Sequence, residues 1–249
     1  MKKLLYLLPL LLAACGGNGD KKPVDSAKTD SAKTASSPIP TDTTFLQKET
    51  TKDYYHIVYV EKNHASSIFK DLLNFKFDHY DSINYKQAYR ILKVRNPKPL
   101  KKYDLAGLPN EWLPVYSYKG KYYLYAPSDW ANVDKRIVTD STIIYRGEEG
   151  PEPYVLKDVK KLNDAKYNLK APPFYQFVKK SNINIYIIDP ATKLSVWEDT
   201  ELPPAYRYRL YVPRASADKY DMVVNYCKAA KMPEFAFDKV DYAALIKGR

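Results

Sequence analysis

The stretch Pro114–Ala126, PVYSYKGKYYLYA, indicates the fold more clearly than any other part of the chain. Two aromatic-rich segments, both suited to β-strands, flank Lys119-Gly120, and glycine permits the positive φ that a two-residue hairpin turn needs. A turn at this point sets which residues face each other: Tyr116 with Tyr123, and Val115 with Leu124. The stretch therefore predicts an antiparallel β-hairpin.

The same register sorts the large side chains of the hairpin onto two faces, because successive residues of a strand point to opposite sides. One face, called the aromatic face below, collects Trp112, Tyr116, Tyr118, Tyr123 and Tyr125. The other face collects Leu113, Val115, Tyr122 and Leu124. Aromatic rings stack on the apolar faces of sugars, so the aromatic face is the candidate ligand-binding surface. The alternative is that its rings pack inside the core.

A second hairpin is predicted over Ile183–Trp197, around the turn Asp189-Pro190-Ala191-Thr192. Aspartate suits the first position of a type I turn and proline the second. A four-residue loop would place Ile185, Ile187, Leu194 and Val196 on one face, with Tyr186 and Trp197 on the other. Further strands are predicted over residues 54–61, 136–146, 154–160, 206–212 and 234–238.

Helices are expected to be few. Ser66–Phe75 predicts a short helix capped by Ser66 or Ser67, with Ile68, Phe69, Leu72 and Leu73 on one face. Residues 85–94 fit a strand or a helix, and residues 216–230 fit a capped helix or a strand through 222–227. Short strands and frequent turns favour a mainly β fold, an antiparallel β-sandwich or barrel-like sheet with one or two short helices. An α+β arrangement is the alternative.

The N-terminus differs in composition from the rest of the chain. Lys2 and Lys3 precede the apolar residues 4–12, LLYLLPLLL, and small residues follow. This order is typical of a secretory signal peptide. The apolar run is too short for a transmembrane helix, which needs roughly 20 residues. It ends in Leu12-Ala13-Ala14-Cys15.

That ending resembles the lipobox of bacterial lipoproteins. The resemblance implies that the Cys15 thiol receives a diacylglyceryl group, that residues 1–14 are removed, and that the new amine is acylated, with palmitate for example. Two or more acyl chains hold a protein stably at a membrane. With the linker and the Tyr- and Lys-rich domain that follow, the chain is similar to envelope lipoproteins of the Bacteroidota type. This implies a lipid anchor outside the cytoplasm, at the outer membrane.

Residues 15–45 are expected to form the lipidated cysteine and a flexible linker. The segment repeats DSAKT at 25–29 and 30–34, and its four lysines and four aspartates cancel in charge. With few large apolar residues it cannot bury enough surface to offset the entropy of ordering. The remaining residues, 46–249, are long enough for a single globular β-rich domain.

The charge and the cysteines restrict the classes of partner. The formal charge is +11, and removal of Lys2 and Lys3 leaves +9. Because the basic residues are spread along the chain, and the protein is expected outside the cytoplasm, a nucleic acid is not expected as the partner. After lipidation of Cys15 only Cys227 remains, so no intrachain disulfide can form. We expect Cys227 to be buried and the domain to be monomeric.

The sequence contains few patterns that indicate catalysis. His56, His64 and His79 fall in no HExxH motif, and no metal or cofactor is expected. Ser67-Ile68-Phe69-Lys70 matches the SxxK pattern of serine acyl-enzymes, but the KTG and SDN elements are missing, so we attribute the match to chance. Carboxylates cluster at Glu148, Glu149 and Glu152, and at Glu198, Asp199 and Glu201 beside Trp197.

These observations favour a non-catalytic domain that binds a glycan or an envelope protein. The first alternative is a glycan hydrolase that uses Glu198, Asp199 or Glu201 as its acids, because paired carboxylates can cleave glycosides. The second alternative is an envelope assembly or scaffold lipoprotein.

Overall fold

The computed structural model describes residues 44–50, 55–147, 150–173, 178–227 and 230–249, which belong to one compact unit. The predicted signal peptide (1–14), Cys15, nearly all of the predicted linker, and the Glu148-Glu149 pair lie outside these residues. Among the described residues, no helix combines the length and the apolar character that crossing a bilayer requires.

The described residues form a mainly β fold, as predicted, with one open, mixed 13-stranded sheet. Its strands are β1 Thr44–Thr50, β2 Tyr55–Glu61, β3 Glu111–Tyr118, β4 Lys121–Ala126, β5 Lys135–Val138, β6 Thr142–Gly147, β7 Gly150–Val155, β8 Asp158–Asn163, β9 Lys166–Ala171, β10 Ser181–Asp189, β11 Leu194–Asp199, β12 Tyr208–Pro213 and β13 Met222–Cys227. The helices are α1 Ser67–Leu72, α2 His79–Arg95, α3 Pro204–Arg207 and α4 Tyr242–Ile246, with the 3₁₀ turns η1 Trp130–Asn132 and η2 Arg214–Lys219.

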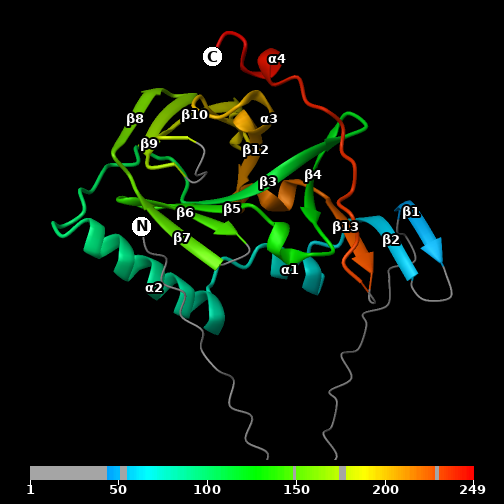
Figure 1. Ribbon diagram of the computed structural model, residues 1–249. Helices are drawn as coiled ribbons and strands as arrows, with labels where there is room; N and C mark the ends of the chain where they lie inside the picture. The colour runs from blue at the N-terminus through cyan, green and yellow to red at the C-terminus, as the bar shows by residue number, and fades with distance from the viewer. Residues whose placement is uncertain (1–43, 51–54, 148–149, 174–177, 228–229) are drawn as a thin grey trace, which may run out of the picture. The chain divides into compact units, whose positions relative to one another are not determined.

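Strand β3 is the point at which the sheet divides (Figure 1). Its first residues pair with β5, which continues to β6 and β7. Its middle pairs with β12, and the sheet runs on through β11, β10 and β9 to β8. Its end pairs with β4, which lies parallel to β13 and leads to β2 and β1.

The main core draws its residues from β5–β6 and from β9–β12, together with Trp112 of β3. The indoles of Trp112 and Trp197 meet edge to face with ring centroids 5.2 Å apart. Strand alternation explains the composition, because inward positions of facing strands supply large apolar side chains. Trp112, Trp197 and Tyr211 are the largest fully buried side chains described.

The second core lies on the other part of the sheet, where Val58, Tyr125 and Val223 come from β2, β4 and β13. Phe235 and Phe237 of the C-terminal segment cover it. That segment, predicted to be a strand over 234–238, is not one. Isolated hydrogen bonds hold it to the sheet instead, such as the one that Asp238 N donates to Ser117 O at 2.9 Å.

The first hairpin is confirmed, with Tyr116 opposite Tyr123 and positive φ at both turn residues, 50° at Lys119 and 75° at Gly120. The predicted pairing of Val115 with Leu124 is wrong. Val115 pairs with Leu210 of β12, and Leu124 pairs with Met222 of β13. The two strands separate beyond Tyr116 because each continues into a different part of the sheet.

The second hairpin is also confirmed, but its predicted faces are wrong. Ile185 lies opposite Trp197, and Tyr186 lies opposite Val196. Lys193 takes a φ of 57° at the end of the turn, and a β-bulge shifts the register on β10 between Ile187 and Asp189. The extra residue, Ile188 on β10, moves the pairing of the two strands by one residue, so that Trp197 shares a face with Ile185. The core face therefore collects Ile183, Ile185, Ile187 and Trp197.

Other elements depart from the predictions at their ends. Helix α1 has Ser66 as its N-cap, and residues 85–94 belong to the 17-residue helix α2, longer than expected. Residues 136–146 form two strands, and so do residues 154–160. The predicted strand over residues 206–212 begins within helix α3 instead. Strands β1 and β9 were not predicted.

Cys227 is a free thiol and is partly exposed, whereas we expected it to be buried.

Candidate functional site

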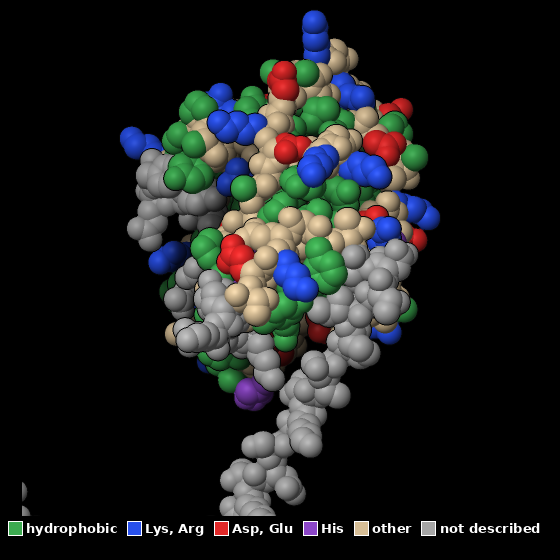
Figure 2. All heavy atoms as spheres, turned by 90° about the vertical axis from the view of Figure 1, so that its right-hand side faces the viewer, with side chains coloured by type: hydrophobic (Ala, Val, Ile, Leu, Met, Phe, Trp, Pro, Cys, Tyr) green, Lys and Arg blue, Asp and Glu red, His purple; other side chains and the backbone are tan. Residues whose placement is uncertain are grey.

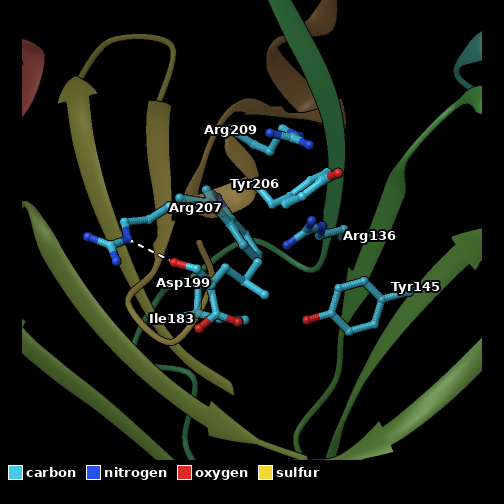
Figure 3. Close-up of a pocket in the computed structure, with 9 residues that line it drawn as sticks. Arg136, Tyr145, Ile183, Asp199, Tyr206, Arg207 and Arg209 are labelled. Atoms are coloured by element: carbon cyan, nitrogen blue, oxygen red, sulfur yellow. Dashed lines mark hydrogen bonds between the residues drawn. The ribbon is translucent and has the colours of Figure 1, made fainter. Parts of the chain in front are cut away.

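A small cavity lies at one end of the main core, and three arginines contribute to its wall (Figure 3). Its volume is about 20 Å³, slightly more than the roughly 10–15 Å³ that a single water needs. Tyr145, Trp197, Asp199 and Tyr206 also line the cavity. We call this site the arginine cavity; its three arginines are Arg136, Arg207 and Arg209.

Cross-strand pairing brings these residues together from the two sides of the main core. Arg136 of β5 is the direct neighbour of Tyr145 on β6. Arg209 of β12 is the direct neighbour of Trp197 on β11. Directly paired residues point to the same face of a sheet. The main core packs these two faces together, so the two pairs meet at the cavity.

Arg136 is enclosed by aromatic rings. Its guanidinium carbon lies 4.8 Å from the ring centroid of Tyr145, 5.4 Å from that of Trp197 and 4.7 Å from that of Tyr211. These are cation–π distances. The charge is balanced by Asp134, whose Oδ2 lies 3.1 Å from Nη2 of Arg136 and accepts a hydrogen bond from the Tyr211 hydroxyl. Arg136 is thus a fixed cation in the wall.

The carboxylate of Asp134 is kept ionised by this arrangement. Burial alone would raise the pKa of Asp134, but Arg136 and the Tyr211 hydroxyl outweigh it and hold the pKa below its ordinary value. The Asp134–Arg136 pair contributes no net charge to the cavity, whose wall also contains Arg207, Arg209 and Asp199.

Arg207 and Arg209 are positioned by backbone carbonyls. Nε of Arg207 donates to Leu202 O at 3.1 Å, and Nη1 of Arg209 donates to Tyr208 O at 2.8 Å. A guanidinium has five N–H donors, so these bonds leave donors free on Arg209, whereas Arg207 also interacts with the side chains of Tyr208 and Glu198. Neither side chain forms an ion pair within the described part of the chain.

The indole of Trp197 adds a further donor. Trp197 is 1% exposed, and its Nε1–H has no acceptor among the described residues. By contrast, Nε1 of Trp112 donates to Pro109 O at 2.7 Å. An unsatisfied buried donor costs about 1–3 kcal/mol. Because Trp197 lines the cavity, a ligand oxygen within hydrogen-bond distance of its Nε1 would remove this cost.

Asp199 supplies the acidic side chain of the cavity wall. Its oxygens already accept hydrogen bonds from the Ser181 hydroxyl, from Asn182 N at 3.1 Å and from Glu201 N at 3.2 Å. These donors belong to the start of β10 and to the turn after β11. Asp199 therefore holds the start of β10 and the turn after β11 together at the edge of the cavity. Because its oxygens already accept these three hydrogen bonds, it does not satisfy the other donors of the wall.

Glu198 points away from the cavity, because it precedes Asp199 on the same strand. It accepts hydrogen bonds from Asn184 Nδ2, Tyr186 OH and Tyr208 OH at 3.2, 2.9 and 3.0 Å. Burial would raise the pKa of Glu198, but these bonds, Asn184 foremost, hold it below its ordinary value. An ionised Glu198 is poorly suited to donate a proton.

The cluster at Glu198, Asp199 and Glu201 thus does not assemble into a catalytic pair, and Glu148 and Glu149 of the other cluster lie outside the described residues. Glu198 and Asp199 lie on opposite faces of the sheet, and Glu201 pairs with Lys180 at 3.2 Å. Glu152 accepts from the Tyr154 hydroxyl. A group of three or more His, Cys, Asp or Glu side chains able to hold a metal ion does not occur among the described residues.

The aromatic face is divided between the two cores rather than exposed. Trp112 lies in the main core, so the prediction that it shares a face with the four tyrosines is wrong. The pairing of β3 with β4 does not extend to Trp112, because β3 pairs there with β5 and β12. The four tyrosines stay together, but the C-terminal segment covers them, with Tyr116 stacked on Phe237 and Tyr118 edge-on to Phe235. This favours the packing interpretation.

The charges on the side of β1 and β2 show no single-sign field. Figure 2 shows basic, acidic and apolar side chains interspersed on the face that it presents. This agrees with the even spread of lysine and arginine along the sequence.

Comparisons of the chain with protein-family models, with curated proteins and with solved structures found no match.

Proposed function

We propose that the protein is an envelope lipoprotein, anchored outside the cytoplasm through Cys15, whose β domain binds a ligand without catalysis. The arginine cavity is the binding site, and the ligand group that it accepts is an oxyanion, a carboxylate or a phosphate. The observation that supports this most directly is the set of donors in the wall of one small space: its lining includes Arg136, Arg207 and Arg209, and also Trp197, whose buried indole N–H has no acceptor among the described residues.

The size of the cavity limits what enters it. A carboxylate is larger than the water that about 20 Å³ admits, so binding requires movement of the wall. Tyr206 is the candidate for this movement. It is 47% exposed, stands on the short helix α3, and lies between Arg136 and Arg209 in Figure 3. The cavity would therefore take the charged end of a ligand, such as the carboxylate of an acidic sugar, rather than a whole ring.

Substitution of Arg207 and Arg209 together by glutamine tests the proposal. Hydrogen bonds to charged groups contribute about 1.5–3 kcal/mol each, so affinity for an oxyanion should fall at least about tenfold. The measurement is calorimetric titration with glucuronate and with phosphate, and with glucose as the uncharged comparison. Glucose should not bind.

The matched control is Arg214→Gln. Arg214 is an exposed arginine that pairs with Glu111 at 2.9 Å outside the cavity, and its loss should leave affinity unchanged. Absence of binding by both anions to the wild type, or equal affinity in the wild type and the double variant, would overturn the assignment of this cavity.

The anchor is tested separately. The support for it is the lipobox pattern at Leu12–Cys15. Cells grown with a labelled fatty acid should label the wild type and not Cys15→Ala. Label retained by the variant would refute the lipidation.

A further inference from the structure

Helix α2 carries a row of apolar side chains that face solvent. Tyr80, Ile83, Ile91 and Val94 are 62%, 49%, 47% and 82% exposed. At 3.6 residues per turn these positions, with Gln87 between them, fall in a single stripe along the helix. The buried residues of α2, Asp81 and Leu92, lie on a different side. We call this row the α2 stripe.

A row of basic side chains runs beside the α2 stripe. Lys86, Arg90 and Lys93 follow one edge of it, and Arg95 ends the helix. None of these four forms an ion pair with another described residue. The single acidic residue of α2 is Asp81, which is buried and paired with Arg146. The exposed surface of the helix is therefore apolar and positively charged.

The helix is held firmly in place beneath the sheet. Asp78 caps its N-terminus through a bond from Asp81 N at 2.8 Å, and the Asp81–Arg146 pair ties it to β6. It packs against β7, where Gly150 approaches Asn84 so closely that a Cβ would lie 3.2 Å from its amide nitrogen. Figure 1 shows α2 at the lower edge of the sheet, far from the α4 end. The α2 stripe is a preformed surface.

We infer that α2 docks on an anionic lipid surface, with the α2 stripe inserted among the head groups and the basic row against their charges. A helix with an apolar stripe next to lysine and arginine is suited to lie in a membrane interface. Each basic residue near an anionic bilayer strengthens binding about fivefold. A second copy of the chain is a poorer occupant, because it would bring a second basic row against the first. A nucleic acid would leave the apolar row uncovered.

Vesicle sedimentation tests this inference. All arms use the full chain carrying Cys15→Ala, so that any contribution of the N-terminus is common to them. Phosphatidylcholine vesicles with and without roughly one-third phosphatidylglycerol provide the anionic and neutral surfaces. Ile83→Glu with Ile91→Glu should lower partitioning onto anionic vesicles at least about tenfold, because two apolar contacts are lost and two like charges are added.

A second variant isolates the charge. Lys86→Gln with Arg90→Gln and Lys93→Gln should lose about fivefold per residue on anionic vesicles and change little on neutral ones. The matched control is Leu162→Glu, a similarly exposed residue (52%) on β8, which Figure 1 places at the upper left, above α2. It should partition like the wild type, and thermal melts should show that each variant is folded.

Three results would overturn the inference: equal partitioning of the Ile83/Ile91 variant and the Leu162 control, equal binding of the wild type to neutral and anionic vesicles, or a lipid-free dimer that the Ile83/Ile91 variant abolishes. The Arg207/Arg209 variant should bind vesicles normally. Failure of membrane docking and failure of the arginine cavity are therefore distinguishable.

Discussion

Replacing Tyr116 and Tyr123 together by alanine is expected to lower the free energy of unfolding by about 4 kcal/mol, because truncation of a buried aromatic costs roughly 3–5 kcal/mol and Tyr123 is only partly buried. Tyr116 stacks on Phe237 at 4.6 Å and meets Tyr125 edge-on at 5.5 Å. Burial raises the pKa of the Tyr116 hydroxyl well above its ordinary value, as expected for a ring enclosed by the C-terminal segment.

Urea unfolding followed by intrinsic fluorescence measures this cost. The matched control is Tyr80→Ala with Tyr226→Ala, two tyrosines that are 62% and 37% exposed, and it should cost less than about 1 kcal/mol. Tyr116→Phe with Tyr123→Phe keeps both rings and should also be mild. If the alanine pair were no more destabilising than the control, the four tyrosines would be accessible, and the aromatic face would return as the ligand surface.

The aromatic face shows where sequence-based prediction ends. The hairpin was predictable because its turn and strands lie within thirteen residues and obey local rules. The cover over it comes from Phe235 and Phe237, more than a hundred residues later and outside any strand. No local pattern indicates which distant segment will lie on a given face. The separation of β3 from β4 beyond Tyr116 likewise depends on competition from β12 and β13.

The same limit applies to the arginine cavity. Arg207-Tyr208-Arg209 places two arginines two residues apart, and strand alternation puts Arg209 on the inward face with Tyr211. A charged residue at an inward position is a usable signal for a buried ion pair or a ligand site. Its third member, Arg136, comes from another strand across the core, and only the assembled fold brings it there. The bulge at Ile188, which pairs Ile185 with Trp197, could likewise not be predicted from composition.

Asp134→Ala is expected to lower the free energy of unfolding by about 3 kcal/mol, because it leaves the largely buried charge of Arg136 uncompensated, and breaking a buried ion pair costs about 3–5 kcal/mol. The Arg136 side chain is 12% exposed. We take the lower end of the range because the Asp134 side chain is 37% exposed. The Tyr211 hydroxyl loses its acceptor in the same variant.

A matched surface pair separates burial from charge. Glu111 pairs with Arg214 at 2.9 Å, but the two side chains are 33% and 48% exposed, so Glu111→Ala should cost less than about 1 kcal/mol. Asp134→Ala combined with Arg136→Met removes both charges of the pair, including the largely buried charge of Arg136, and should recover part of the loss. Equal costs for Asp134→Ala and Glu111→Ala in urea unfolding would show that Arg136 is solvated and does not form a fixed wall of the cavity.

The pH dependence of the Asp134 effect has a defined sign. Because Arg136 and Tyr211 hold the folded-state pKa of Asp134 below its ordinary value of 3.8, the unfolded chain binds more protons at this carboxyl as the pH falls below about 4. The stabilisation is therefore complete above that pH and is lost as the pH falls through the folded-state pKa. The difference in unfolding free energy between the wild type and Asp134→Ala should narrow in acid and remain constant from pH 5 to 8. A difference that instead widened in acid would mean that the carboxyl is protonated more readily in the folded protein, and that Arg136 does not stabilise its charge.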